Sequence, residues 1–355
     1  MKKLYHFTAF MLIAMLVLSA CGQSKQAAPQ ESAKPSEQPA QSSAPEPKKE
    51  EKKVVKIGIT QIVEHPSLDA ARNGFLAALK DNGFTEGDNL QVDTQIAQGD
   101  MSNNTSIAQK FAADKKDLIL AISTPSAQAV VKQITDTPVL FTAITDPLGA
   151  KLVSSLEKPG GNVTGTSDTH PEAITKLMDF IASQFPKVKT IGIVANEGEQ
   201  NSLINVKKAE EALAKHNIKV VKAAVTNSSE VKQGAESLVG RVDAIYVPKD
   251  NTVVAALESM IQVAEKNKLP LFVGEKDSVK RGGFASYGFE YFDLGYTTGK
   301  MAVDILKNGK KPGDIPVGFP ENLDLAINMK AAKNEGIEVT DAMKSMVKDP
   351  KNIIE

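Results

Sequence analysis

The chain has 355 residues, a formal net charge of −1 and 41% hydrophobic residues. This near-neutral balance excludes a strongly basic nucleic-acid-binding protein and an acidic disordered chain, and it is typical of a globular protein. The single cysteine excludes an intrachain disulfide framework and a cysteine-based zinc site, and the four histidines are scattered along the chain. We therefore expect no metal, no cofactor and no nucleic-acid partner.

The N-terminus has the layout of a secretory signal peptide. Two lysines follow Met1, an apolar segment runs from Phe10 to Leu18, and the sequence Leu18-Ser-Ala-Cys21 comes next. These four residues resemble the bacterial lipobox, in which the cysteine thiol receives a lipid before cleavage leaves it N-terminal. The alternative is an uncleaved apolar anchor with a chance cysteine. We predict a lipoprotein signal peptide over residues 1–20 and lipidation at Cys21.

A linker of low hydrophobicity follows. Between Gly22 and Lys53 there is no Val, Ile, Leu, Met, Phe or Tyr, so this segment cannot bury enough apolar surface to offset its ordering. Residues 21–53 are predicted to be a disordered tether. With a lipid at its N-terminus, the protein would be anchored at the extracytoplasmic face of the cell membrane.

Short runs of Val, Ile and Leu alternate with helical patterns from Val54 onward, which predicts an α/β fold. A strand opens at Val55 and a similar one at Thr190, so the chain contains two related halves. Alternation of this kind indicates parallel sheets with helices on both faces, here two doubly wound lobes of four to six strands each. Further strands are expected at Leu90–Gln95, Leu118–Ile122, Val139–Ala143, Asn162–Gly165, Lys219–Ala224, Ala244–Val247, Leu271–Gly274, Gly283–Ser286 and Leu323–Asn328. Helices are expected at Ser67–Asn82, Asn104–Ala113, Ser202–Asn217, Thr252–Asn267 and Gly295–Leu306.

The residues that follow the predicted strands are mostly polar. Ligands of open α/β sheets bind beyond the carboxyl ends of the strands, so these residues are the candidate site. Thr124-Pro125 and Asp146-Pro147 each read as a helix N-cap followed by proline. A helix N-terminus with hydroxyls at Ser123, Thr124 and Ser126 can hold a carboxylate. The alternative is that Thr124 only caps its helix.

Asp168 and Asp250 lie at predicted strand ends of the second half and suit an ammonium group. Each has a structural alternative, because Asp250 is a plausible N-cap for Thr252–Asn267 and Asp168 can cap a helix beginning near Pro171. One lobe that binds a carboxylate and another that supplies carboxylates would suit a zwitterion in the cleft.

Sequence motifs of nucleotide binding and nucleophilic catalysis are missing: there is no G-x-G-x-x-G, Walker A or G-x-S-x-G. We expect no enzyme.

Five motifs occur in order along the chain. They are His65-Pro-Ser-Leu-Asp-Ala-Ala-Arg-Asn-Gly-Phe75, Ser123-Thr-Pro-Ser-Ala-Gln128, Thr145-Asp-Pro147, Pro159-Gly-Gly-Asn-Val-Thr-Gly165 and Val247-Pro-Lys-Asp-Asn251. Together they resemble one family of substrate-binding proteins of ABC importers. It is the type 1 periplasmic-binding-protein family that includes binding lipoproteins for tryptophan and other aromatic amino acids, and the likeness extends from Val54 to about Gly336.

The resemblance implies a Venus-flytrap fold with three crossovers between the lobes, and no catalysis. Lobe 1 would comprise residues 54–166 and 288–316, and lobe 2 residues 167–287 and 317–355. The ligand's head group would be held by residues of both lobes, with His65 either over the ligand or only in turn contacts. Carried onto this chain, the first-lobe residues are Ser123, Thr124, Ser126, Thr142 and Thr145, and Asp168, Asn201, Ser202 and Asp250 face them.

The resemblance implies that the protein captures a small ligand, an amino acid and preferably an aromatic one such as tryptophan, and delivers it to an ABC permease and its ATPase. The chain has no Trp, so aromatic contacts would have to come from residues such as Phe141, Tyr246, Tyr287, Phe289 and Tyr291. The alternatives are a sugar or nucleoside receptor and a sensor domain for a signalling partner. Few aromatic residues and scarce arginine weigh against a sugar pocket.

Overall fold

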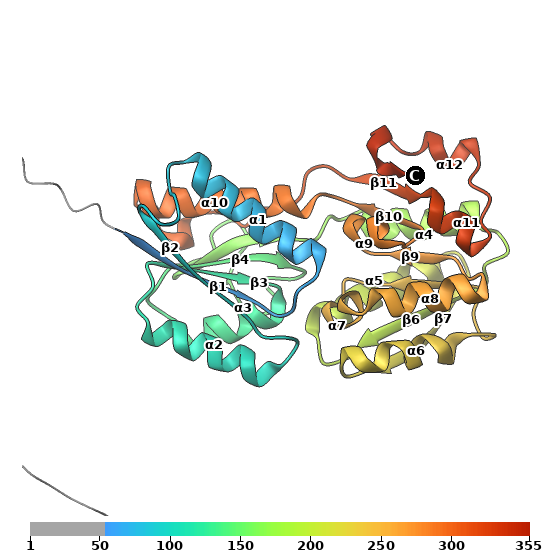
Figure 1. Ribbon diagram of the computed structural model, residues 1–355, viewed down its shortest axis with the longest axis horizontal. Helices are drawn as coiled ribbons and strands as arrows, with labels where there is room; N and C mark the ends of the chain where they lie inside the picture. Colours follow the sequence, from blue (N-terminus) through green and yellow to red (C-terminus); the bar gives the residue numbers. More distant parts are fainter. Residues whose placement is uncertain (1–53) are drawn as a thin grey trace, which may run out of the picture. The chain divides into compact units, whose positions relative to one another are not determined.

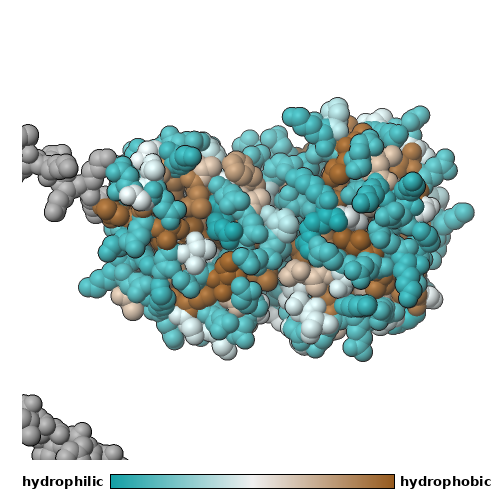
Figure 2. Space-filling model, viewed as in Figure 1, coloured by the Kyte–Doolittle hydropathy of each residue, from teal (hydrophilic) through white to brown (hydrophobic). Residues whose placement is uncertain are grey.

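A computed structural model describes residues 54–355, which belong to one unit of the chain. The predicted signal peptide, Cys21 and the predicted tether lie outside the described residues. Two parallel-sheet lobes make up this unit (Figure 1), which confirms the predicted fold class. In the space-filling view, the visible face is mostly hydrophilic, with apolar side chains scattered over both lobes (Figure 2).

The first lobe is built on a five-stranded sheet in the order β2-β1-β3-β4-β5, with every pair parallel. Strands β3 and β4 are buried along their whole length, as expected of aliphatic runs covered on both faces. The strands are β1 (Val55–Gln61), β2 (Leu90–Ile96), β3 (Leu118–Ile122), β4 (Val139–Ile144) and β5 (Val163–Ser167), and the helices are α1 (Pro66–Asp81), α2 (Met101–Ala113), α3 (Thr124–Gln133) and α10 (Tyr291–Asn308).

The second lobe is built on a seven-stranded sheet in the order β12-β11-β10-β9-β8-β6-β7, in which only the β10–β11 pair is antiparallel. Its apolar residues form two clusters, one under α4 and α5 and one under α6 and α8. The strands are β6 (Thr190–Asn196), β7 (Lys219–Val225), β8 (Ala244–Val247), β9 (Leu271–Val273), β10 (Ala285–Gly288), β11 (Asp324–Asn328) and β12 (Ile353–Ile354). The helices are α4 (Ala173–Gln184), α5 (Gln200–Ala214), α6 (Val231–Leu238), α7 (Asn251–Ala255), α8 (Leu257–Asn267), α9 (Lys276–Arg281), α11 (Met329–Glu335) and α12 (Asp341–Ser345), and 3₁₀ turns lie at Ser228–Glu230 and Pro350–Asn352. A further 3₁₀ turn, Pro312–Asp314, packs on the first lobe, where the N–H of Gly160 donates to the carbonyl oxygen of Gly313 at 3.0 Å.

Two details of the second lobe differ from the sequence predictions. Its sheet has seven strands instead of four to six, because the two-residue β12 joins the six predicted strands and is too short to show a periodic pattern. The helix expected over Thr252–Asn267 is interrupted at Ala256, whose φ of −110° and ψ of 25° separate α7 from α8. No glycine or proline marks that break in the sequence.

Helix α10 returns the chain to the first lobe, where it packs closely on α1. A Cβ atom placed on Gly295 would lie 1.8 Å from the carbonyl oxygen of Ala71, and one placed on Gly74 would lie 2.0 Å from that of Phe292. Only glycine permits this approach of the two backbones. The packing fixes the N-terminus of α10, and with it Tyr291, beside the cleft between the lobes.

Three segments connect the lobes: residues 168–172, 289–290 and 309–323. The third runs beside the end of β5, where the N–H of Ser167 donates to the carbonyl oxygen of Gly318 at 2.8 Å. Three crossovers place the carboxyl ends of both sheets on the two sides of one cleft, which is the arrangement expected of a two-lobed binding protein. Among the described residues, no helix combines the length and apolar character needed to cross a membrane.

Candidate functional site

The N-terminus of α3 forms the first corner of the cleft. Ser123, and not Thr124, is the N-cap, and its side chain makes no capping hydrogen bond. Its φ of 78° and ψ of 155° lie in a region that is nearly exclusive to glycine, so the backbone is strained at this point. Thr124 is 2% exposed, and its Oγ1 has no hydrogen-bond partner among residues 54–355. Capping therefore does not explain these two hydroxyls.

The helix start predicted at Asp146-Pro147 is wrong. After Asp146-Pro147 the chain makes a turn, in which the N–H of Gly149 donates to Asp146 Oδ1 at 2.9 Å. An Asp-Pro pair suits a turn as well as a helix start, and no periodic apolar pattern follows to extend a helix. This corner offers no helix N-terminus to a ligand.

The other first-lobe hydroxyls have different environments. Ser126 Oγ donates to Asn104 Oδ1 at 3.2 Å, and the Nδ2 of this asparagine has no partner in the described part of the chain. Thr142 is fully buried and is linked at 2.9 Å to Thr166, which is linked at 2.7 Å to Thr298 of α10. These contacts are internal to the first lobe, so Thr142 has a structural environment.

Asp168 directly follows β5 of the first sheet, which corrects its expected position at a strand end of the second half. Its N–H donates to the carbonyl oxygen of Ile144, and it does not cap α4, whose N-cap is Glu172. The buried carboxylate accepts hydrogen bonds from Tyr291 Oη at 2.8 Å and from Thr145 Oγ1 at 3.2 Å. Asp168 is thus held rigidly at one end of the cleft, where the segments 168–172 and 289–290 connect the lobes. We call this the hinge end.

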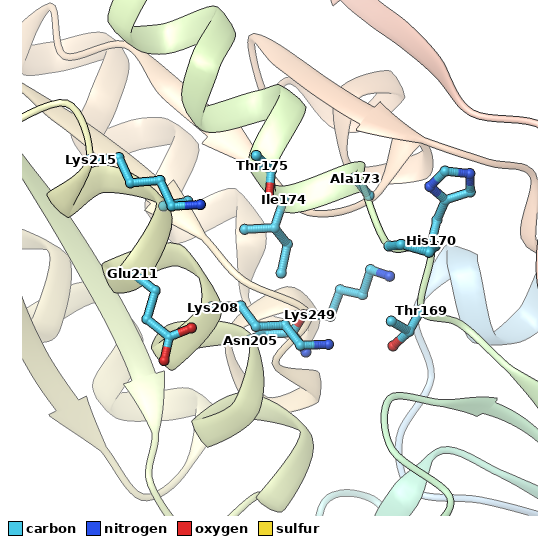
Figure 3. A pocket seen from close by; sticks show the side chains of 12 residues that line it. Thr169, His170, Ala173, Ile174, Thr175, Asn205, Lys208, Glu211, Lys215 and Lys249 are labelled. Atoms are coloured by element: carbon cyan, nitrogen blue, oxygen red, sulfur yellow. The ribbon is translucent and has the colours of Figure 1, made fainter.

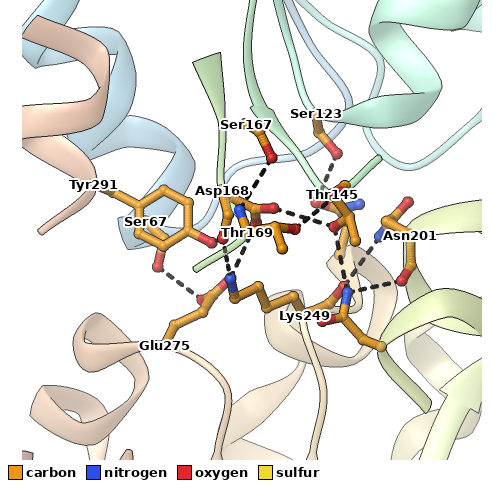
Figure 4. A network of polar contacts seen from close by, with 12 residues as sticks. Ser67, Ser123, Thr145, Ser167, Asp168, Thr169, Asn201, Lys249, Glu275 and Tyr291 are labelled. Carbon is orange, nitrogen blue, oxygen red and sulfur yellow. Dashed lines mark hydrogen bonds and ion pairs between the residues drawn. The ribbon is translucent and has the colours of Figure 1, made fainter. Parts of the chain in front are cut away.

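Lys249 reaches Asp168 from the second lobe (Figure 4). Its Nζ donates to the carbonyl oxygen of Asp168 and lies 3.6 Å from Asp168 Oδ2. The same ammonium group lies 4.8 Å from the centroid of the Phe289 ring, which itself packs at 5.2 Å against Tyr291. Lys249 lies within the motif Val247-Pro-Lys-Asp-Asn251, but sequence reasoning did not single it out, because most lysines are surface residues.

Asp250 is fully buried, and its carboxylate is engaged within its own lobe. It caps α7 by accepting from the N–H of Val253 at 3.0 Å, and it also accepts from the N–H of Asn196 and from Ser202 Oγ, both at 2.6 Å. Desolvation and the neighbouring Glu199 raise the pKa of Asp250 to about 7. The structure therefore favours the helix-cap alternative for Asp250, and Ser202 serves the same cap.

Glu199 organises the second-lobe wall of the cleft, and the sequence did not single it out. Its carboxylate accepts from Asn201 Nδ2 at 2.9 Å and from the N–H groups of Asn251 and Thr252 at 3.1 and 3.0 Å. Asn251 then reaches the first lobe, because its Oδ1 accepts from Ser123 Oγ at 3.1 Å. The buried Oδ1 of Asn201 has no partner among the residues described.

His65 precedes α1 and is 4% exposed. Burial lowers the pKa of its imidazole to about 4, and the adjacent Asn251 side chain offsets only part of that effect. The ring is therefore neutral at physiological pH. Its Nδ1 finds no partner within residues 54–355.

Further contacts join the lobes along the cleft. Ser67 Oγ of α1 donates to Glu275 Oε2 at 2.7 Å, Gln128 Nε2 donates to Gln200 Oε1 at 2.7 Å, and Asn205 Nδ2 donates to Thr145 Oγ1 at 3.3 Å. Together with the Ser123–Asn251 and Lys249–Asp168 contacts, they hold the two lobes in a closed arrangement.

Buried polar atoms without a protein partner gather on both sides of this cleft. Such atoms are uncommon in folded proteins and call for a specific explanation. From the first lobe they are Thr124 Oγ1 and His65 Nδ1, and from the second Asn201 Oδ1 and Asp277 Oδ2. Donors and acceptors are both represented, which suits a ligand with groups of opposite charge.

Two cavities adjoin the cleft. One of about 400 Å³ opens at the mouth between the lobes, and its lining includes Ile62, Val63 and Met101 opposite Glu199 and Asn251. The other, of about 210 Å³, lies between α4 and α5, with Lys208, Lys215 and the stem of Lys249 in its wall (Figure 3). Within residues 54–355, no three His, Cys, Asp or Glu side chains are grouped to hold a metal ion.

The aromatic residues considered from the sequence are divided between core and cleft. Phe141 and Tyr246 are buried in the cores of the two lobes, and Tyr287 packs edge-to-face on Phe180 in the second. Phe289 and Tyr291 lie at the hinge end of the cleft, beside Lys249 and Asp168. The structure therefore brings two of the five aromatic residues to the candidate site.

Residues 56–350 match the model of the family described as ABC transporter substrate binding protein. A tyrosine-binding protein of Clostridioides difficile (strain R20291) is 47% identical over 286 residues, 81% of this chain and 82% of that protein. A solved structure of an ABC domain from Streptococcus pneumonia in complex with L-Trp is 35% identical, covers 83% of this chain and 99% of its own, and gives a TM-score of 0.78.

A third relative supports the closed arrangement of the lobes. The ligand-free, open structure of a substrate-binding protein with adhesive properties from Clostridium difficile is 46% identical and covers 85% of this chain and 98% of its own. Its TM-score is nevertheless only 0.62, below that of the less identical L-Trp complex. The interlobe hydrogen bonds of this chain, such as that between Ser123 and Asn251, belong to a closed arrangement of the lobes. With the fold, the two-sided cleft and these matches in agreement, the chain belongs to the family of ABC transporter substrate-binding proteins.

Proposed function

We propose that this protein is the receptor through which an importer takes up a free aromatic amino acid. The observation that carries the proposal is one closed cleft with the uncapped N-terminus of α3 in one wall and the buried carboxylate of Asp168 at its hinge end. A zwitterion needs both, because burying either charge without a partner is costly. The relatives that bind tyrosine and L-Trp support the aromatic side chain.

The ligand carboxylate is assigned to the α3 corner. The first N–H groups of this ten-residue helix have no capping side chain, and the positive end of the helix dipole favours an anion. Thr124 Oγ1 supplies a further donor, with Ser123 and Ser126 beside it. The backbone strain at Ser123 fits a functional role, since strained residues are often found at ligand sites.

The ligand ammonium is assigned to the hinge end of the cleft, where Asp168 is oriented by Tyr291 and Thr145. The free Oδ1 of Asn201 supplies a second acceptor from the opposite lobe. Asp250 is left out of this assignment, because its hydrogen bonds are those of a helix cap. Contacts from both lobes mean that the ligand favours closure.

The aromatic side chain is assigned to the outer half of the cleft, between His65 and the mouth. A neutral imidazole can pack on an aromatic ring, and the mouth cavity adds apolar contacts from Ile62, Val63 and Met101. Asn251 lies next to His65 and also lines the mouth cavity, so a ligand side chain beside the imidazole would reach this cavity.

Proteins of this family bind small ligands and deliver them to the permease of the transporter. We further propose that Cys21 carries a lipid and that residues 21–53 tether the binding lobes to the outer face of the membrane. The lipobox-like sequence and the composition of the linker support this location.

A thermal-shift screen tests the proposed ligand class. Ligand that binds only the folded protein raises the melting temperature by mass action. L-tyrosine, L-tryptophan and L-phenylalanine should raise it, whereas their N-acetyl and amide derivatives, each lacking one charge, should not. A rise with sugars or nucleosides and none with amino acids would replace the proposal with the sugar or nucleoside alternative.

A further inference from the structure

A further buried carboxyl group, besides that of Asp168, lies at the hinge end of the cleft. Glu275 follows β9 of the second lobe and is 4% exposed. Its Oε2 accepts from Ser67 Oγ of the first lobe at 2.7 Å (Figure 4). The same oxygen accepts from Ser278 Oγ at 3.2 Å. Both donors are neutral hydroxyls, which also accept hydrogen bonds, so these contacts suit a protonated or an ionised carboxyl.

The charges around Glu275 are paired with one another. Lys249, from the end of β8, faces Asp168, and Lys280 of α9 lies 2.9 Å from Asp277. Two cations thus match two carboxylates, and in the described part of the chain no ion pair is formed by Glu275 itself.

The remaining titratable groups packed around Glu275 supply no additional cation. Lys276 of α9 turns away to Glu290 at 2.6 Å. Tyr246 of β8 and Tyr291 of α10 are neutral phenols, because desolvation raises the pKa of both well above its usual value. Desolvation likewise raises the pKa of Glu275 to about 7, and Asp277 and Asp168 add to this effect while Lys249 opposes it.

We propose that Glu275 carries a proton when no ligand is bound and releases it when the ammonium group of the amino acid binds beside it. The step is an exchange of positive charge: the carboxylic acid loses H⁺ to solvent, and the ligand's R–NH₃⁺, held by Asp168 as assigned above, supplies the positive charge that offsets the resulting Glu275 carboxylate. This inference rests on the proposed amino-acid receptor function. It adds that capture of the ligand is coupled to proton release.

Two measurable consequences follow. In the range where Glu275 is protonated in the free protein, binding should release about one proton, and affinity should rise roughly tenfold per pH unit. Above a pH of about 7 both effects should fade, because the carboxylate is already ionised in the free protein.

Isothermal titration calorimetry with L-tyrosine, L-tryptophan and L-phenylalanine tests the coupling. Titrations at about pH 6 in buffers of different ionisation enthalpy count the protons released, and repeats at about pH 8.5 should give a count near zero. Glu275→Gln should bind more weakly, with no proton release and no pH dependence. Ser67→Ala, which removes the interlobe donor but keeps the carboxyl, should still release the proton.

The possible results separate the two proposals. Wild-type protein that binds an amino acid at about pH 6 without releasing a proton would overturn this inference and leave the receptor function standing. Proton release that persists in Glu275→Gln would also overturn it, and would point to the buried Asp250–Glu199 pair. If none of the three amino acids binds, the receptor function fails first.

Discussion

Ser123 Oγ donates a hydrogen bond to Asn251 Oδ1 at 3.1 Å, and this contact joins two loops from opposite lobes. On one side, Ser123 has a strained backbone and begins α3. On the other, Asn251 begins α7 and is held by Glu199. The pair shows how closure is built: each lobe fixes its own loop through internal hydrogen bonds, and the two rigid loops then meet around the candidate ligand site.

Thr124→Val should weaken ligand binding and leave the fold intact. The valine has nearly the same shape, but the hydroxyl that we assign to the carboxylate is lost. A hydrogen bond to a charged group contributes about 1.5–3 kcal/mol, which corresponds to a roughly 10- to 150-fold rise in Kd. The melting temperature should change little, because Thr124 Oγ1 makes no internal hydrogen bond among the described residues.

Thr142→Val is the matched control for this experiment. Its hydroxyl is equally buried, but it belongs to the Thr142–Thr166–Thr298 chain inside the first lobe. We expect a loss of about 1–3 kcal/mol in the free energy of unfolding, with Kd nearly unchanged. Urea unfolding and calorimetric titration of both variants give the two quantities. The assignment of the α3 corner would be wrong if Thr124→Val changed only stability.

Asp168→Asn should cost about 2–5 kcal/mol of ligand affinity, because it leaves the buried ammonium group without its carboxylate. Asp250→Asn is the comparison, since that carboxylate is engaged by α7, Asn196 and Ser202. This second variant should lower the melting temperature and keep most of the affinity. The protein contains no tryptophan, so the emission of added L-tryptophan reports binding directly in both variants. The reverse pattern would move the ammonium site to Asp250.

Sequence reasoning located the fold well because the signals were local. The strand Leu118–Ile122 was predicted with its observed bounds, since five buried aliphatic residues in a row leave little choice. The seventh strand of the second sheet is defined by its pairing with β11, which no local pattern records, and no glycine or proline marks the break at Ala256.

The ligand site was harder to predict from the sequence. Whether a carboxylate can contact a buried ligand depends on its own burial, and burial cannot be read from the residue type alone. Glu199 and Glu275 look like ordinary surface residues in the sequence, yet both are buried at the carboxyl ends of strands in the closed cleft. Asp250 satisfied the same positional rule and is a helix cap. Position at a strand end therefore selects candidates, and only the hydrogen-bond partners separate ligand contacts from caps.

Cys21→Ala should release the protein from the membrane fraction or leave an unprocessed precursor. A lipid attached to the thiol anchors the chain, and alanine cannot accept it. Cell fractionation and intact-mass measurement of the mature N-terminus check this. Ser19→Ala is a suitable control, because it changes a small residue of the same motif and keeps the thiol. Normal processing with unchanged membrane attachment of Cys21→Ala would contradict lipidation.

Stability should fall as the pH rises toward 8, in part because of Glu335. This residue ends α11 and is 2% exposed; its Oε2 accepts from the N–H of Leu271 at 2.9 Å, and its Oε1 has no partner in residues 54–355. Burial raises the pKa of Glu335 to about 8. The folded state therefore binds a proton that the unfolded chain releases near its ordinary pKa.

The stabilisation from this proton is complete below a pH of about 4.5 and is lost as the pH rises through about 8, with a limiting slope of about 1.4 kcal/mol per pH unit. Glu275 and Asp250, whose pKa values are raised to about 7, add to the slope below that pH. Between about pH 7 and 8 the slope should therefore be smaller in Glu335→Gln than in the wild type when the free energy of unfolding is measured against pH. Glu265→Gln changes a carboxylate that accepts from Asn334 at 2.6 Å and that raises the pKa of Glu335 less than burial does, so this variant should keep most of the wild-type slope. Parallel curves for wild type and Glu335→Gln would show that this carboxyl group is ionised in the folded protein despite its burial.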